Sequence, residues 1–505
     1  MKRESWFSSF FSSVRSFFWP IYGQENIKFI SLLLMFTSSI FCYGIVRIHK
    51  DTYILSAPLA TANTISFLKM YFVMPISILY FVFFCWLTNK VSKEKAFLFS
   101  VFPLLLFFSL FYLFFLPNIS SLHMSVETLK KLQTQYPSVR NFFPVIAYWM
   151  FSFYYVFAEL IGTIVVTFLF WGFANYCVTK EEKIRFYPLF VSYSYIISAI
   201  GSYLQGMLFS KSSKFKHGSL ESNNALFLNF YLIVGSLLFF IAVYYFINNY
   251  VVTNETNSEN FSNVFKMKPK HKISFSDSIK TIIQNKNLMY ILGVIICYGV
   301  TTNLIEVTWK ELIRKQYNGC HAEIGYYLSN FYFILSAFVI STGFLNKFLL
   351  ARFNWGLATS FSPALLFLSS FIFFGLIVFE SYIPPFFLLG YSAAALAVHV
   401  GFIQDALAKS GRYAVLDPNL QMVYSSLPED TMTKGKASVD MIGSRFGKSI
   451  GSFLESSLSM LFNGADQIAL APIFMPVVLL SCGLWVFFLL MIYASLPSLQ
   501  TKKAE

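Results

Sequence analysis

The sequence predicts an all-α integral membrane protein with about twelve transmembrane helices. Of its 505 residues, 56% are hydrophobic and 12% are charged, whereas about a quarter of the residues in a typical soluble protein are charged. A membrane-spanning helix needs about 20 apolar residues, so the chain has room for roughly twelve spans and their connections. The 62 Phe and 30 Tyr residues suit a lipid-facing surface with aromatic belts at its two interfaces.

Twelve apolar runs define the expected spans. They cover residues 28–47, 65–88, 97–116, 144–170, 187–209, 225–248, 288–306, 325–348, 357–379, 383–407, 437–462 and 469–495. Residues 1–27 precede them as a separate segment, in which phenylalanines recur at helical spacing among Lys2, Arg3 and Arg15. We expect this segment to lie as a short helix in the headgroup region, and it has the features of neither a signal peptide nor a transit peptide.

The spans divide into two halves of six around a polar, lysine-rich stretch at mid-chain. The expected segments are an amino-terminal half at 28–249, a basic cytoplasmic linker at 250–286, a carboxy-terminal half at 287–496 and a cytoplasmic tail at 497–505. A weak internal repeat supports the division, because the residues IGSYL at 200–204 recur as IGSFL at 450–454. Repeated halves are typical of transporters with a site between them. The pattern predicts a major-facilitator-like architecture with a central cavity.

The distribution of basic residues predicts the orientation of the chain. With the amino terminus placed inside, most of the 38 Lys and Arg residues fall in cytoplasmic segments, as the positive-inside rule requires. This arrangement puts both termini in the cytoplasm. Two cytoplasmic ends require an even number of spans, which agrees with twelve.

Patterns that indicate enzymes or cofactors are missing from the sequence. The six cysteines form no C-x-x-C pair and the six histidines no paired spacing, so we expect neither a metal site nor a disulfide. The run from Gly443 to Ser449 resembles a phosphate-binding loop, but it has one residue too few between its glycines and follows no strand. We therefore expect no enzyme and no resident cofactor. The net charge of +14 favours anionic lipid or an anionic substrate, because the aqueous segments are too short for a nucleic-acid-binding domain.

Charged residues within or at the ends of spans carry most of the functional information, because each costs a few kcal/mol to insert. They are Arg47, Lys50, Asp51, Lys69, Glu159, Glu306, Lys310, Lys436, Asp440, Arg445 and Lys448. Arg47 and Lys50 share one helix face and either bind a polyphosphate or extend toward the interface, which is the commoner fate. Glu159 is the single charge in its run and needs a cation, a substrate group or a proton. Glu306 and Lys310, one helical turn apart, act in function or simply pair with each other.

The eleventh span combines a glycine at every fourth position with four charged side chains. The glycines are Gly443, Gly447 and Gly451, and the charges are Lys436, Asp440, Arg445 and Lys448. The glycines give a smooth face for close helix approach. Since a lipid-facing helix would not carry these charges, we expect the span to be central. The alternative is that Lys436 pairs with Asp440 and the other two charges face the cytoplasm.

Taken together, these motifs resemble the ATP/ADP translocases of obligate intracellular bacteria and plastids. The resemblance runs in order along nearly the whole chain and includes Arg47-x-x-Lys50-Asp51, Ala158-Glu159-Leu160, Arg185-Phe186-Tyr187-Pro188, Asn303-Leu304-Ile305-Glu306-x-x-Trp309-Lys310 and Lys434-Gly435-Lys436-Ala437-Ser438-Val439-Asp440. The essential charged positions of that family correspond here to Lys50, Glu159, Glu306 and Lys436. The sequence departs from the common pattern at Ile161 and Ile450, which bears on the preferred nucleotide more than on the fold.

The resemblance implies exchange of ADP, with phosphate, for ATP by alternating access. We add Arg47, Asn303, Arg445 and Lys448 as further candidate substrate-binding residues. The expected partners are the nucleotide and the lipid bilayer, with no nucleic acid, and we expect a multi-pass monomer in the inner membrane of an intracellular bacterium. Proton-coupled uptake of GTP or UTP, with Glu159 titrating, and exchange of NAD are alternatives within transport. A membrane enzyme acting on a lipid-linked phosphate and a scaffold that transports nothing are alternatives from other classes.

Overall fold

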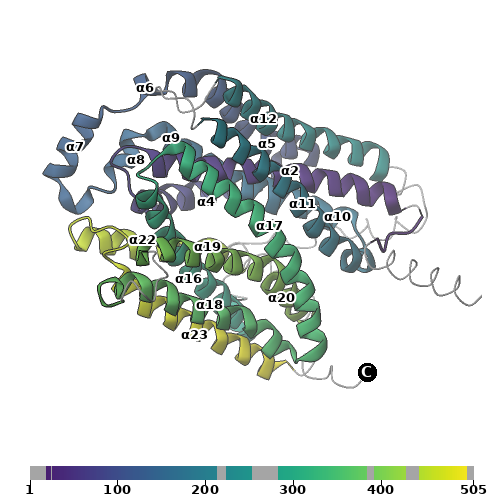
Figure 1. Ribbon diagram of the computed structural model, residues 1–505. Helices are drawn as coiled ribbons and strands as arrows, with labels where there is room; N and C mark the ends of the chain where they lie inside the picture. Colours follow the sequence, from purple (N-terminus) through teal and green to yellow (C-terminus); the bar gives the residue numbers. More distant parts are fainter. Residues whose placement is uncertain are drawn as a thin grey trace, which may run out of the picture.

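The computed structural model describes residues 19–23, 25–212, 223–252, 282–383, 392–427, 439 and 443–496 (Figure 1). Within these residues all regular secondary structure is helical. The expected linker at 250–286, the amino-terminal segment at 1–27 and the tail at 497–505 fall largely or wholly outside them. So does Lys436, and so does the side chain of Arg445.

The helices before residue 252 pack around α2 and form what we call the amino-terminal group, drawn in purple to teal in Figure 1. Its principal helices are α2 (Glu25–Ser56), α3 (Asn63–Leu68), α4 (Met74–Lys90), α5 (Lys93–Leu110), α9 (Trp149–Leu160), α10 (Trp171–Cys177), α11 (Lys180–Ser212) and α12 (Asn223–Phe246). Shorter segments complete it: η1 (Lys69–Val73), η2 (Phe111–Phe115), η3 (Leu116–Asn118), α6 (Ile119–Leu122), α7 (Val126–Gln135), η4 (Pro137–Val139), α8 (Phe143–Ala147), η5 (Ile161–Phe170) and η6 (Ile247–Val252). Several of these segments continue a helix without a break, so that Trp149–Cys177 is a single rod.

The helices after residue 282 form the carboxy-terminal group, drawn in green to yellow, in which α16 packs against α22 and α23 (Figure 1). This group consists of α16 (Lys286–Gln316), α17 (His321–Arg352), α18 (Trp355–Val378), η7 (Glu380–Tyr382), α19 (Ala393–Gly411), η9 (Arg412–Leu416), α20 (Asp417–Ser425), α22 (Ser444–Leu461) and α23 (Ala471–Ser495). The two groups meet where α17 packs against α11 and α2, and where α22 packs against α3.

Nine helical segments in the described part of the chain are long and apolar enough to cross a membrane. Three of the expected spans, at 187–209, 383–407 and 437–462, are not among the nine, although α11, α19 and α22 lie there as helices. In α19 and α22 the reason is a set of polar and charged residues that the helix buries toward other helices, such as Asp405 and Glu455, both 0% exposed.

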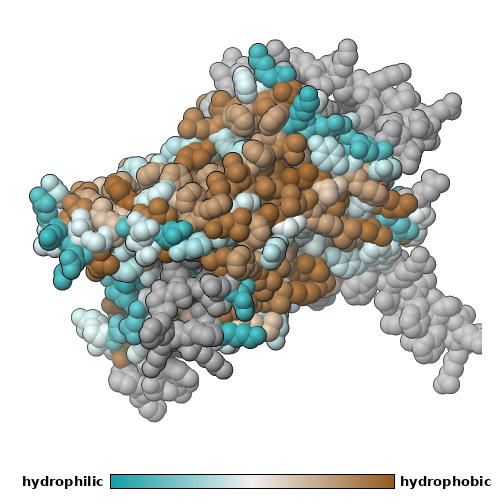
Figure 2. Space-filling model, turned by 90° about the horizontal axis from the view of Figure 1, so that it is seen from above, coloured by the Kyte–Doolittle hydropathy of each residue, from teal (hydrophilic) through white to brown (hydrophobic). Residues whose placement is uncertain are grey.

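The surface of the molecule has the composition that lipid contact requires. Figure 2 shows a broad hydrophobic area across one face, with hydrophilic residues gathered mainly toward its ends. Large apolar side chains such as Leu79, Tyr231, Leu368 and Leu480 are each more than 60% exposed. A water-facing surface rarely carries so many of these in one continuous area, whereas the hydrocarbon of a bilayer accepts them.

Several helices extend beyond the apolar runs that predicted them. The first expected span ended at residue 47, but α2 continues to Ser56; the seventh ended at 306, but α16 continues to Gln316; and the tenth ended at 407, but α19 continues to Gly411. The helices continue past the expected spans for one physical reason. Each extension carries charged residues that are buried and paired, such as Lys50 with Glu159, Lys310 with Asp51 and Lys409 with Asp405, so that the helix stays inside the protein although its sequence is no longer apolar.

The glycine pattern of the eleventh span is confirmed as a packing surface. Gly443, Gly447 and Gly451 all face α16, and a methyl group added to Gly447 would lie 3.0 Å from backbone atoms of Ile295 and Ile296. The facing glycine of α16 is Gly299, where an added methyl group would lie 2.6 Å from the carbonyl carbon of Gly447. The backbones of α16 and α22 therefore touch directly, as small residues permit.

At one end of the bundle, polar side chains join the two groups. Asn63 and Asn141 each donate a hydrogen bond from Nδ2, to the carbonyl oxygens of Ala465 at 2.8 Å and Gly464 at 3.0 Å respectively. Arg140 donates from Nε to the same Gly464 oxygen at 2.8 Å. We call this end, formed by residues 57–64, 136–142 and 459–467, the bonded end.

The contact between α16 and α22 generates a first prediction. Gly299→Ala should lower the melting temperature of the detergent-solubilised protein, because the new methyl group meets backbone that cannot rotate away; overpacking of this kind costs about 1–3 kcal/mol. Gly375→Ala in α18 is the matched control, since the added methyl group has no neighbour within 4 Å. Equal melting temperatures for the two variants would contradict the close approach.

Candidate functional site

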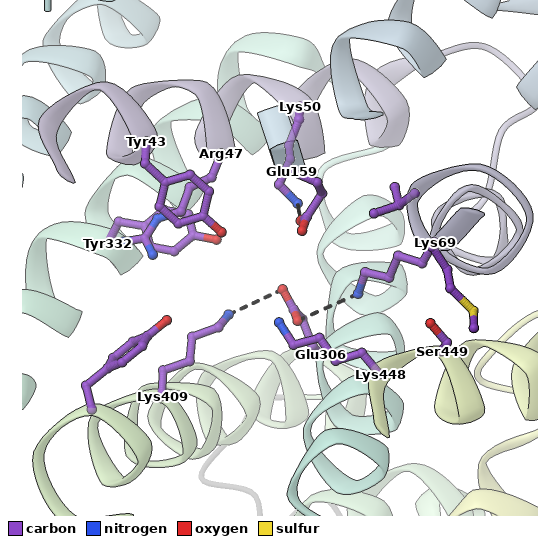
Figure 3. Close-up of a pocket in the computed structure, with 13 residues that line it drawn as sticks. Tyr43, Arg47, Lys50, Lys69, Glu159, Glu306, Tyr332, Lys409, Lys448 and Ser449 are labelled. Atoms are coloured by element: carbon purple, nitrogen blue, oxygen red, sulfur yellow. Dashed lines mark hydrogen bonds and ion pairs between the residues drawn. The ribbon is translucent and has the colours of Figure 1, made fainter. Parts of the chain in front are cut away.

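A cavity lies between the two groups of helices and is lined by charged and aromatic side chains (Figure 3). The lining residues of the amino-terminal group are Tyr43, Arg47, Lys50, Lys69, Val73, Met74 and Glu159, and those of the carboxy-terminal group are Glu306, Tyr332, Lys409, Tyr413, Lys448 and Ser449. Both groups thus contribute cations to one space, as the sequence predicts for a central cavity.

Helical spacing explains how α2 supplies three of these side chains. Tyr43, Arg47 and Lys50 stand at positions i, i+4 and i+7, which lie on one helix face. The same rule places Glu306 one turn before Lys310 on α16, and Asp405 one turn before Lys409 on α19.

Lys50 is the centre of the contacts at the α2 wall. Its Nζ lies 2.8 Å from Oε1 of Glu159 and 3.4 Å from Oδ1 of Asp51. It also donates a hydrogen bond to the Tyr155 hydroxyl at 3.0 Å. The lone carboxylate of Glu159 has therefore found the cationic partner that its burial requires.

Glu306 is shared by three lysines from three different helices. Its Oε1 lies 2.8 Å from Nζ of Lys310 and 3.3 Å from Nζ of Lys409, and its Oε2 lies 3.8 Å from Nζ of Lys69. Lys69 belongs to the amino-terminal group, so one of these ion pairs crosses between the groups. The sequence left open whether Glu306 pairs with Lys310 alone; the pair exists, but it is part of a larger network.

A second ion pair crosses between the groups behind the cavity wall. Lys310 Nζ lies 2.9 Å from Oδ2 of Asp51, and the side chains are 1% and 0% exposed. Ion pairs this deeply buried are costly to break from one side, because the remaining charge is left without a partner.

Asn303 connects the cavity to a buried carboxyl group. Its Oδ1 accepts a hydrogen bond from Lys69 at 2.8 Å, and its Nδ2 donates to Oε2 of Glu455 at 2.9 Å. Glu455 also accepts a hydrogen bond from the Ser66 hydroxyl of the other group. It is 0% exposed, and within the described residues it is the buried carboxyl group that has no basic partner within 4 Å. Hydrogen bonds from Ser66 and Asn303, rather than an ion pair, therefore hold this carboxyl group.

The cavity has an excess of positive charge. In the part of the chain that the structure describes, the lining contains five basic side chains and two acidic ones. Lys310, Asp51 and Asp405, which pair with them, bring the totals to six and four. Arg47 and Lys448 have no carboxylate within 4 Å among the described residues, whereas Lys409 is held by Asp405 at 2.5 Å. The site as a whole therefore attracts an anion.

Most of the residues selected from the sequence meet in this cavity. Lys50, Glu159, Glu306, Arg47 and Lys448 line it, and Asn303 lies directly behind it. The side chain of Lys448 points into the cavity toward Glu306 (Figure 3). Lys436 and the side chain of Arg445 lie outside the described residues.

The sequence analysis missed the acid and base of α19 and passed over Lys69. Lys409 falls two residues beyond the apolar run that defined the tenth span, so it was not among the charges assigned to spans. The one-turn spacing of Asp405 and Lys409 is a signal that could have found them, since Glu306 and Lys310 show the same spacing. Lys69 was recognised as a charge in a span but not selected.

Comparison with known proteins identifies relatives along the whole chain. The model of a family described as TLC ATP/ADP transporter matches residues 5–495. The "ADP,ATP carrier protein 1" of Chlamydia muridarum is 32% identical over 457 residues, which cover 89% of this chain and 85% of the relative. The "ADP,ATP carrier protein 4" of Rickettsia typhi is 29% identical over 491 residues, covering 95% and 94%.

Two solved structures share the fold. A bacterial homologue of the iron transporter ferroportin in an inward-facing state matches with a TM-score of 0.55 at 13% identity, over 92% of this chain and 98% of that one. A D-xylose-proton symporter matches with a TM-score of 0.52 at 10% identity, over 94% and 99%. At such low identity the likeness concerns the fold alone, and it agrees with the major-facilitator-like architecture expected from the sequence.

The unequal pairing of the buried carboxylates generates a second prediction. Asp51→Asn should destabilise the protein by about 3–5 kcal/mol, because it leaves Lys50 and Lys310 short of a counter-charge in a dry interior. Glu455→Gln keeps the shape of the side chain, can still accept the hydrogen bonds from Ser66 and Asn303, and breaks no ion pair, so it should leave the folded yield close to wild type. Both effects are measured by thermal unfolding followed by size-exclusion chromatography. A Glu455→Gln variant as unstable as Asp51→Asn would contradict this difference between the two carboxyl groups.

Proposed function

The chain belongs to the TLC ATP/ADP transporter family, and on this basis we propose that it exchanges ATP for ADP across a membrane by alternating access. The observation that carries the proposal is the cavity between the two groups of helices, with cations from both sides and two positive charges in excess. A nucleoside di- or triphosphate supplies the missing negative charge. A site between two packed units is also where alternating access needs it.

The arrangement of the chain in the membrane is part of the proposal. We propose twelve spans in two halves of six, 28–249 and 287–496. They consist of the nine apolar helices together with α11, α19 and α22. The excess of Lys and Arg in the segments taken as cytoplasmic supports both termini inside. The bonded end then lies on the outer side, and the structure corresponds to a carrier closed toward the outside. We further propose that the carrier works as a monomer in the inner bacterial membrane.

In the proposed binding mode, lysines from both halves hold the phosphates. Lys50, Lys69, Lys409 and Lys448 are the lysines of the described cavity, and the family resemblance adds Lys436, which stays a prediction together with Arg445. Glu159 and Glu306 form ion pairs with the lysines while no substrate is bound. A bound polyphosphate takes over this role, because its charge-assisted hydrogen bonds are at least as strong as those of a carboxylate.

The ion pairs between the groups explain why exchange is favoured over net uptake. An empty carrier that opens its bonded end must separate Lys69 from Glu306 and Asp51 from Lys310. Separation leaves charges unpaired in a low-dielectric interior, which is costly. A nucleotide between the groups supplies a substitute partner, so that the loaded carrier reorients and the empty one stays in place. Phosphate moving together with ADP fits the same cations.

Proton-coupled uptake of a nucleotide is the second candidate function. It predicts that uptake collapses with a protonophore and does not depend on nucleotide inside. The contact of 2.8 Å between Glu159 and Lys50 favours a role for Glu159 as a counter-ion over that of a proton carrier, because an adjacent cation stabilises the ionised carboxylate.

Transport by cavity lysines generates a third prediction. In proteoliposomes loaded with ADP, Lys50→Gln, Lys69→Gln and Lys409→Gln should each raise the KM for labelled ATP about tenfold, because each removes a charge-assisted hydrogen bond worth about 1.5–3 kcal/mol. Lys315→Gln is the matched control, since this exposed lysine pairs with Asp466 at the bonded end, away from the cavity. Uptake that survives unchanged in all three cavity variants would refute the assignment of these lysines.

The same proteoliposomes decide between the two modes of transport. Exchange predicts that labelled ATP enters only when ADP is present inside, and that a protonophore has little effect. A competition series of unlabelled nucleotides against labelled ATP then identifies the preferred substrate. Uptake into empty liposomes that is abolished by the protonophore would instead support proton symport.

A further inference from the structure

The cavity has two chemically different ends. Figure 3 shows Tyr43, Arg47 and Tyr332 together at one end, and Lys69 and Ser449 at the other. Along α2 alone, the rise from Tyr43 to Lys50 is about 10 Å, so one wall passes from aromatic to cationic over the length of a small elongated ligand. A nucleotide has the same division, with a planar base at one end and phosphates at the other.

Arg47 differs from the paired lysines of the cavity. It is 6% exposed, and within the described residues it has no carboxylate within 4 Å and its Nε has no hydrogen-bond partner. Its guanidinium carbon lies 3.8 Å from the ring centre of Tyr332 and 5.6 Å from that of Tyr43. Two tyrosine rings from opposite groups, α2 and α17, are thus its main contacts.

The Arg47 guanidinium lies over the face of the Tyr332 ring, with 3.8 Å between its carbon and the ring centre. Guanidinium groups also lie against the faces of nucleobases. A planar base is attracted to a tyrosine face and to a guanidinium plane for the same reasons. The aromatic end of the cavity therefore offers two kinds of surface on which a base can stack.

We propose that Tyr43, Arg47 and Tyr332 form the subsite for the nucleobase, so that the substrate lies with its base between these side chains and its phosphates toward Lys69 and Lys448. The inference rests on the proposed function and deepens it. In the empty carrier the Arg47 guanidinium covers the Tyr332 ring; on binding, the base stacks on the tyrosine or on the guanidinium itself. At the other end of the cavity, Glu306 pairs with the lysines until the phosphates of the substrate replace it.

An alternative is that Arg47 binds a phosphate, since a guanidinium without a carboxylate also suits that ligand. The two assignments predict different losses of affinity when a side chain at the aromatic end is substituted. Loss of a base subsite weakens ligands that carry a base and changes the preference among bases. Loss of a phosphate subsite weakens every polyphosphate, with or without a base.

The test measures inhibition of labelled ATP binding to the purified full-length protein by ATP, GTP, CTP and inorganic tripolyphosphate, which has no base. Tyr332→Leu should weaken ATP about tenfold, reduce the differences among the three nucleotides and leave tripolyphosphate unchanged, because loss of stacking on one aromatic ring has about this effect. Tyr332→Phe keeps the ring and should bind ATP nearly as wild type does. Lys69→Gln, at the other end, should weaken ATP and tripolyphosphate alike.

Three results would overturn the base subsite. They are equal weakening of ATP and tripolyphosphate by Tyr332→Leu, differences in affinity among ATP, GTP and CTP that stay as large in that variant as in wild type, and wild-type protein that binds tripolyphosphate as tightly as ATP. Tyr43→Leu gives the same comparison from the other group of helices if Tyr332→Leu fails to fold. Wild-type protein that binds no nucleotide would instead refute the proposed function itself, so the two failures are distinguishable.

Discussion

A carboxylate shared by three lysines in a low-dielectric interior is stable only while all four side chains stay in place, and Glu306 is held in this way by Lys69, Lys310 and Lys409. Each lysine belongs to a different helix, and Lys310 reaches further to Asp51 of the other group. The position of α16 relative to η1, α19 and α2 is therefore fixed by charge as well as by apolar packing. Burial of these charges is tolerated because each has a partner of opposite charge. The cavity as a whole still has fewer negative than positive side chains.

The packing of glycines supports this network from behind. Because Gly299 and Gly447 let the backbones of α16 and α22 touch, α22 brings Lys448 to the cavity and Glu455 to Asn303. A larger residue at either glycine would move Lys448 away from the cavity and Glu455 away from Asn303. The close approach of α16 and α22 and the charges of the cavity therefore depend on each other.

Part of the candidate site could be predicted from the sequence, because charges within or at the ends of apolar runs are visible without a structure. That signal marked eleven positions without ranking them; the family resemblance then selected Lys50, Glu159 and Glu306, which the structure brings into one cavity. The signal failed for Lys409, which lies just beyond an apolar run. Only the structure shows that α19 continues past Lys409 to Gly411. The sharing of Glu306 among three lysines could not be predicted, since it depends on how separate helices pack. The fold class followed from composition, whereas helix ends depended on buried ion pairs.

The hydrogen bonds of Asn63, Asn141 and Arg140 to the 464–465 backbone make the bonded end a polar seam rather than an apolar one. An apolar seam would resist opening in proportion to its buried area. Hydrogen bonds of a polar seam are exchanged for hydrogen bonds to water, at a net cost of only about 0.5–1.5 kcal/mol each. The two groups are therefore held together at this end by contacts that water can replace one at a time.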